Sequence, residues 1–275
     1  MNKYITCIGL AVFLLLGDVQ SQTVHSSIIS TNSSISFTAI ETWASGWVPP
    51  TSWKQVYADP VIQSEMYADI KTKFVWPQTV RLNVWVQNPL KGAGLFPAPA
   101  GEIDYALCLS GPVWYGANFS TEVRLIDVAS ATGASVGDVG DNDIVRFRLR
   151  LDRPFKFSTG IHTLTPALIY YRVEPMTYRV KTEGNVLSPQ LNYDWRPDPR
   201  FRLTLGSGFM HDDGEKGGIP ANIVSYWIST GVKLRSKSPE CWLNTCYQRY
   251  DTLNRPANRP VRNFDLVNVS LSVKF

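Results

Sequence analysis

The sequence predicts an all-β chain, an antiparallel transmembrane β-barrel of about twelve strands, within a range of about 10 to 14. Three observations predict it: apolar and polar residues alternate over many separate segments, tight turns and long loops follow one another in succession, and aromatic residues lie at both ends of the apolar faces. Hydrophobic residues make up 44% of the 275 positions and charged residues only 18%, so a disordered chain is excluded. A net charge of +4 without runs of Lys or Arg gives no support to nucleic-acid binding.

The N-terminal residues 1–21 have the pattern of a cleaved signal peptide. Lys3 precedes an apolar stretch from Ile5 to Leu16, and Val19 and Ser21 suit the cleavage site. The apolar stretch is too short for a stable transmembrane helix. We therefore expect export from the cytoplasm and a mature chain that starts at Gln22 and forms one barrel domain over residues 22–275.

Alternation with a period of two defines the expected strands, because successive side chains of a strand point to opposite faces. It is clearest in Gln78–Asn88, Asp143–Asp152, Leu187–Trp195 and the C-terminal segment. The weakest segments are the first and the eleventh, and Ile161–Val173 is apolar on both faces. In chain order the expected strands are Ile35–Ala44, Glu65–Phe74, Gln78–Asn88, Ile103–Leu109, Phe119–Leu125, Asp143–Asp152, Phe157–Val173, Leu187–Trp195, Phe201–Phe209, Val224–Leu234, Trp242–Asp251 and Val267–Phe275.

Short and long connections alternate between these strands, as is typical of transmembrane barrels. Tight turns are expected at Trp76–Gln78, near Pro112, and at Asp152–Pro154, Arg196–Pro199 and Ser236–Pro239. The long loops are Ser45–Pro60, Pro89–Gly101, Ser130–Asn142, Glu174–Asn185, His211–Pro220 and Thr252–Asn263. An even number of strands returns both chain ends to the side of the tight turns.

Aromatic residues on the apolar faces fall into two groups, as expected of the girdles at two membrane interfaces. Those near the tight turns are Phe74, Phe119, Phe157, Tyr193, Trp195, Phe201 and Phe275, and those toward the other end are Tyr105, Tyr171, Phe209 and Tyr226. The alternative is a soluble secreted β-sandwich or lipocalin-like barrel, which also alternates but buries its apolar face.

The C-terminal segment Asn268–Phe275 resembles the last strand of Gram-negative outer-membrane proteins, which end in an aromatic residue after alternating apolar positions. Tyr193–Gly206 is similar to a hairpin of the same class. This resemblance covers the mature chain as a pattern and points to no particular family. It implies an outer-membrane location in contact with outer-membrane lipid.

Three arginines, Arg146, Arg148 and Arg150, share one face of one expected strand, and that face is polar. Together with Arg81 and Arg124 they are expected to line the lumen. Fixed positive charge in a narrow pore favours anions, so we expect a passive channel for small solutes, anions included. In the alternative interpretation the arginines pair with lumen carboxylates and fill the interior, as in a plugged structural or partner-binding barrel. The sequence indicates no cofactor and leaves the oligomeric state open.

A second candidate site surrounds His211 and Asp213, with Asn222 and Ser225 further along the chain. It resembles outer-membrane phospholipase A, a barrel enzyme with a His-x-Ser-Asn-Gly motif on one strand and an Asn on the next. His211 matches that motif and Asn222 could orient it, but Asp213 stands where the nucleophilic Ser belongs. Ser225 has the parity of the opposite face. Acyl transfer needs a hydroxyl activated by the imidazole, so an ordinary turn, or a divalent-cation site, competes with the enzyme hypothesis.

Cys241 and Cys246 are candidates for a local disulfide, which an oxidising compartment would permit. Their odd separation places them on opposite faces of a regular strand, so a bridge between them requires a loop at that position.

Overall fold

The structure is a computed structural model that describes residues 34–45, 60–89, 102–128, 144–176, 184–213, 221–253 and 263–275. The expected signal peptide and the start of the mature chain lie outside the described residues. The six expected long loops also lie largely outside them. None of the described residues forms a helix long and apolar enough to cross a membrane.

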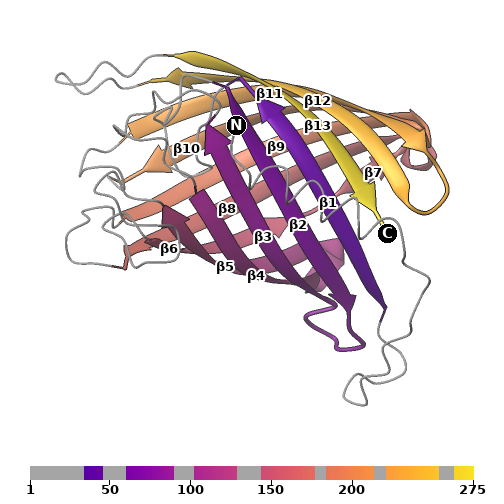
Figure 1. Ribbon diagram of the computed structural model, residues 1–275, viewed down its shortest axis with the longest axis horizontal. Helices are drawn as coiled ribbons and strands as arrows, with labels where there is room; N and C mark the ends of the chain where they lie inside the picture. Colours follow the sequence, from indigo (N-terminus) through magenta and orange to yellow (C-terminus); the bar gives the residue numbers. More distant parts are fainter. Residues whose placement is uncertain are drawn as a thin grey trace. The chain divides into compact units, whose positions relative to one another are not determined.

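The described chain is a single antiparallel sheet that closes on itself (Figure 1). Its strands are β1 (Ile35–Ala44), β2 (Val61–Lys71), β3 (Thr79–Pro89), β4 (Glu102–Pro112), β5 (Asn118–Val128), β6 (Ile144–Asp152), β7 (Phe155–Phe157), β8 (His162–Pro175), β9 (Gly184–Asp198), β10 (Phe201–Asp212), β11 (Ala221–Arg235), β12 (Glu240–Thr252) and β13 (Phe264–Lys274). Two 3₁₀ turns, η1 (Trp114–Gly116) and η2 (Ser158–Gly160), join strands. Because β7 has three residues and pairs only with β8, while β6 pairs directly with β8, the barrel has twelve strands.

Closure is made by β1 and β13, which pair antiparallel from Thr38 opposite Lys274 to Ala44 opposite Asn268. The first and last strands of an open sheet would each expose a row of backbone N–H and C=O groups. In hydrocarbon every such group without a partner costs several kcal/mol. Pairing β1 with β13 therefore removes the two edges that these strands would otherwise leave open.

The outer wall of the barrel is apolar and exposed. Large side chains with more than a third of their surface accessible occur at alternate positions of nearly every strand, for example Leu82 at 52%, Leu107 at 43% and Leu271 at 43%. A soluble sandwich would pack this face against a second sheet, whereas here it covers the outside of one closed sheet. This apolar outer face is suited to contact with lipid. Glu41 is an acidic exception on it, and its carboxylate accepts a 2.7 Å hydrogen bond from Ser64 Oγ.

Two sequence predictions need correction. The strand expected over Phe157–Val173 begins only at His162, because Ser158–Gly160 form a turn in which Gly160 adopts φ +89°, a conformation that suits glycine. Tyr171 was expected in the outer aromatic girdle but faces the interior with 6% of its surface exposed. Both faces of β8 are apolar because its inward side chains pack together: Ile169 and Tyr171 cluster with Val186 of β9.

The two ends of the lumen differ. We call the end with the tight turns the turn end and the other the loop end. At the loop end inward-facing side chains of several strands are fully buried: Val61, Gln87, Val173, Val186 and Asp212 all have 0% exposure. Toward the turn end Arg81 and Arg150 keep 40% and 31% of their side chains exposed. Inward side chains are therefore buried at the loop end and partly exposed toward the turn end.

Candidate functional site

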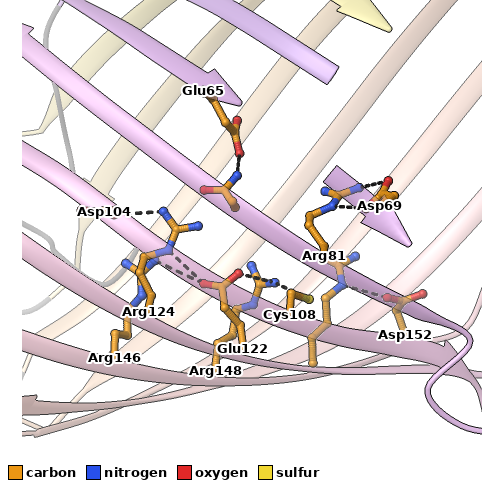
Figure 2. Close-up of polar contacts among 12 residues, drawn as sticks. Glu65, Asp69, Arg81, Asp104, Cys108, Glu122, Arg124, Arg146, Arg148 and Asp152 are labelled. Carbon is orange, nitrogen blue, oxygen red and sulfur yellow. Dashed lines mark hydrogen bonds and ion pairs between the residues drawn. The ribbon is translucent and has the colours of Figure 1, made fainter. Parts of the chain in front are cut away.

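The arginine-rich wall of the lumen is formed by strands β2 to β6, and neighbouring strands supply opposite charges to it (Figure 2). The arginines of β6 alternate with apolar residues, so all three lie on the inward face, as predicted. In register, Arg148 lies opposite Glu122 of β5, and Arg146 lies opposite Arg124. The pair Arg148–Glu122 has opposite charges and stabilises the sheet, whereas Arg146 and Arg124 have like charges and depend on carboxylates beside them.

Glu122 is the centre of this wall. Its carboxylate lies 3.1 Å from Arg124 Nε, 3.7 Å from Arg146 Nη2 and 3.0 Å from Arg148 Nη2. Arg124 also contacts Asp104 of β4 through Nη1 at 2.9 Å. Both carboxylates are buried, with 5% of each side chain exposed. Three guanidinium groups are thus held by shared carboxylates, an arrangement that keeps buried arginines paired.

The remaining arginines of the wall are paired as well. Arg150 Nε lies 2.8 Å from Asp152, and Arg81 forms two hydrogen bonds with Asp69, at 2.7 and 2.9 Å. Arg81 also lies 3.9 Å above the ring of Tyr67. Much of the positive charge expected from the sequence is therefore compensated, because the cross-strand carboxylates become neighbours only when the strands pair.

The three arginines of β6 differ in accessibility. Arg146 has 5% of its side chain exposed and its guanidinium lies 5.6 Å from the ring of Tyr171. Arg148 and Arg150 have 27% and 31% exposed. Of the predicted ladder, Arg148 and Arg150 can therefore reach solvent in the lumen, while Arg146 is a packed interior residue.

Searches with known proteins give no match to a family model and no similar curated protein sequence. Solved structures, in contrast, match over almost the whole described barrel. The COG4313 outer membrane channel from Pseudomonas putida F1 covers 88% of this chain and 95% of its own, with a TM-score of 0.54 and 11% identity. The β domain of the Bordetella autotransporter BrkA gives a TM-score of 0.50 at 11% identity, covering 88% of this chain and 99% of its own. The KdgM porin gives a TM-score of 0.48 at 10% identity, covering 87% and 99%.

The chain has the twelve-stranded β-barrel fold of these outer-membrane proteins. At 11% identity the match shows the fold alone, so the roles of individual residues must be inferred from their contacts in this structure.

The His211 site lies at the loop end of the outer-membrane barrel, at paired positions of β10 and β11. His211 Nδ1 and Asn222 Oδ1 are 2.8 Å apart, so the pairing of imidazole and amide suggested by the sequence is formed. Ser225 points into the lumen, where its Oγ lies near Gly208, and so is separated from the outward-facing His211. The structure brings His211 and Asn222 together and leaves the hydroxyl on the other face of the sheet.

Asp213 does not contact a hydroxyl either. Its carboxylate accepts hydrogen bonds from the backbone N–H and the side-chain amide of Asn185, both at 2.7 Å. Although desolvation raises the pKa of this carboxyl, those hydrogen bonds outweigh it and hold the pKa below its usual range. Asp213 therefore remains an anion that fixes the start of β9. Within the described residues no group of three or more His, Cys, Asp and Glu side chains is placed to hold a metal ion.

Cys241 and Cys246 both lie on β12, which is a regular strand over Glu240–Thr252. Their thiols are free, as is that of Cys108 on β4. The disulfide considered from the sequence is not formed, because the odd separation of five places the two side chains on opposite faces of the strand.

The sequence did not single out the wall formed by β9 to β12. There Trp227 of β11 lies across β10 and donates its indole N–H to Asn192 of β9 at 3.1 Å. The alternation of apolar and polar residues in the sequence places Trp227 at an inward position. The further signal is the pair of glycines at alternate positions of β10, Gly206 and Gly208, which leave room for its ring against the neighbouring strand.

Proposed function

We propose that this barrel is a narrow passive channel of the outer membrane for small solutes, with a preference for anions. The observation that carries the proposal is the position of Arg148 and Arg150, which are inward-facing and partly exposed. Fixed guanidinium groups in a narrow aqueous passage attract anions and repel cations. One structure with the same fold is described as an outer membrane channel, which agrees with this function.

The paired carboxylates limit how strong the preference can be. Glu122, Asp104, Asp69 and Asp152 each contact an arginine of the wall. We therefore expect modest anion selectivity rather than exclusion of cations. The same pairing supports a second candidate, a barrel whose lumen is closed, and so does the complete burial of inward side chains at the loop end.

Conductance in planar lipid bilayers separates the two candidates. If the protein is a channel, adding it in folded form to the bilayer gives discrete current steps. Under a salt gradient, the sign of the reversal potential should then show that anions pass more easily than cations. Replacing Arg148 and Arg150 by Gln should move the reversal potential toward that for cations. Absence of current from folded protein would reject the channel, and unchanged selectivity in the double variant would remove these arginines from the mechanism.

A lipid-modifying enzyme is the remaining candidate, favoured by the His211–Asn222 hydrogen bond on the outer face. Hydrolysis of an ester also needs a nucleophile, and the hydroxyl of Ser225 lies on the inner face. Release of fatty acid that persists in His211→Ala would exclude this histidine as a catalytic residue.

A further inference from the structure

One arginine of the lumen is held differently from those of the ladder. Arg202 of β10 donates from Nη2 to Asn244 Oδ1 at 3.2 Å, and its guanidinium lies 5.7 Å from the ring of Trp242. Among the described residues it forms no ion pair within 4.0 Å, in contrast to each arginine of β3, β5 and β6. An amide and an aromatic face position a guanidinium without neutralising it. Arg202 therefore keeps its charge available to a solute.

Glycine makes room for this arginine. Arg202 lies opposite Gly231 of β11, and a Cβ at that position would lie 3.5 Å from the guanidinium and 2.8 Å from Asn244 Oδ1. The neighbouring charged pair, Lys233 and Glu240, is joined at 3.1 Å at the turn end. The local arrangement thus holds a cation without an ion-pair partner within 4.0 Å against amide and indole groups, with the charged side chains of Asp194 and Arg196 of β9 near enough to interact with it.

Trp227 lies on the same wall, and its ring is seated flat on β10. A Cβ built on Gly206 would lie 2.0 to 2.3 Å from three ring atoms, so the indole occupies the space that any other residue's side chain would need. The indole N–H is bound to Asn192, which fixes the ring's rotation. The ring lies over β10 on the inner side of the sheet, between the positions of Gly206 and Gly208.

Several neighbours of this ring are polar and uncharged, and Asp194 of β9 lies two positions along from Asn192. Gln190 and Ser225 flank the adjacent Gly208, and Gln248 lies directly opposite Trp227 in the sheet. A flat aromatic face bordered by amide and hydroxyl groups suits a sugar ring, whose C–H groups pack on the aromatic while its hydroxyls form hydrogen bonds. Trp227 and Arg202 lie on neighbouring strands, four residue steps or about 13 Å apart along the strand direction.

We propose that the β9–β12 wall is a solute-binding site for an anionic sugar, in which Trp227 stacks on the sugar ring and Arg202 binds a carboxylate at the other end of the molecule. The proposal rests on the proposed channel function, since solutes in transit would pass this wall, and it names their chemical class. It also adds a second anion contact on a separate wall, because β10 lies three strands away from β6, whose Arg148 and Arg150 carry the proposed anion preference.

Three probes of matched chemistry test the site. Lactobionate carries a sugar ring and a carboxylate, lactitol has the same skeleton without the carboxylate, and gluconate has the carboxylate without the ring. Binding is measured by saturation-transfer NMR on the folded full chain in detergent micelles. We expect lactobionate to bind most tightly, with a dissociation constant about tenfold lower than either partial probe, because it alone makes both contacts.

Two variants assign the contacts. Arg202→Gln should weaken lactobionate about tenfold and leave lactitol unchanged, and Trp227→Ala should weaken lactobionate and lactitol about tenfold and leave gluconate unchanged. Trp85→Ala, an inward tryptophan of β3, is the matched control and should change none of the three. Gel mobility before boiling shows that each variant is folded, and Arg202→Lys and Trp227→Phe replace any variant that is not.

Equal affinity for lactobionate and lactitol, or binding unaffected by Trp227→Ala, would overturn the proposal, as would no binding at all. Because binding is measured at equilibrium in micelles, the result does not depend on conduction. If the barrel binds lactobionate but passes no current, the channel proposal is rejected and the binding site stands. If it conducts but does not bind lactobionate, the binding site is rejected and the channel proposal stands.

Discussion

Glu122 shows how a single carboxylate holds the arginine wall together. It contacts Arg124, Arg146 and Arg148, and only 5% of its side chain is exposed. A buried charge is tolerated when it is paired, and removing one member of such a group leaves the others uncompensated. The ladder is therefore a consequence of residues on β4 and β5 as much as of the three arginines on β6.

Replacing Glu122 by Gln tests this dependence at the level of one residue. The amide keeps the volume and removes the charge, so three guanidinium groups lose their shared anion, and we expect a loss of about 3 kcal/mol in unfolding free energy. Urea unfolding in lipid vesicles measures it. The control is Asp152→Asn, whose ion-pair partner Arg150 is more exposed, and a loss as large as that of Glu122→Gln would contradict the special position of Glu122.

Although Glu122→Gln is expected to lower the stability of the barrel, it should strengthen the channel's preference for anions. Glu122→Gln adds net positive charge to the lumen, so the reversal potential of the open channel should move further toward that for anions. A shift toward cations in the bilayer experiment would be inconsistent with a lumen position for this carboxylate.

At the level of the elements, alternation in the sequence predicts most of the strands and their faces. The two weakest predictions, Ile35–Ala44 and Trp242–Asp251, are both strands, β1 and β12, because closure requires a partner for β13 on each side. The ladder's partners were harder to predict, because the contacts of Glu122 depend on register between strands far apart in sequence. Tyr171 was misplaced because its strand is apolar on both faces, so parity could not tell lipid from interior.

The faces of β13 give a direct test of strand orientation. Leu271 faces outward with 43% exposure, while Ser270 beside it has the parity of the lumen. Leu271→Arg should cost about 2 to 4 kcal/mol of folding free energy in vesicles, because a charge on the lipid face is placed in hydrocarbon. Ser270→Arg should cost clearly less. Equal costs at the two positions would show that the wall is not divided into a lipid face and a lumen face.

The whole molecule is one closed sheet, and closure makes its unfolding cooperative. Each of the twelve barrel strands has two hydrogen-bonded neighbours, β1 and β13 included. A barrel of this kind keeps its compact shape in mild detergent and loses it only when all the pairings are broken. The loop end adds packing contacts among Ile126, Ile144 and Val173 from three neighbouring strands.

We therefore expect heat-modifiable migration on an electrophoresis gel. Unheated protein from the membrane fraction should migrate differently from boiled protein, with a single transition between the two forms as the temperature is raised. Identical migration before and after boiling, in protein that fractionates with the membrane, would contradict a closed barrel.

The positions of Cys241 and Cys246 have a consequence for the order of events during biogenesis. Within β12 one sulfur is on the lipid side of the sheet and the other on the water side, so the finished barrel separates them. In an unfolded chain they are five residues apart, and an oxidant could join them. The resulting small ring cannot extend into a strand, so β11 and β13 would lose their shared neighbour. Insertion into the sheet must precede oxidation, and reducing conditions should raise the yield of refolded protein.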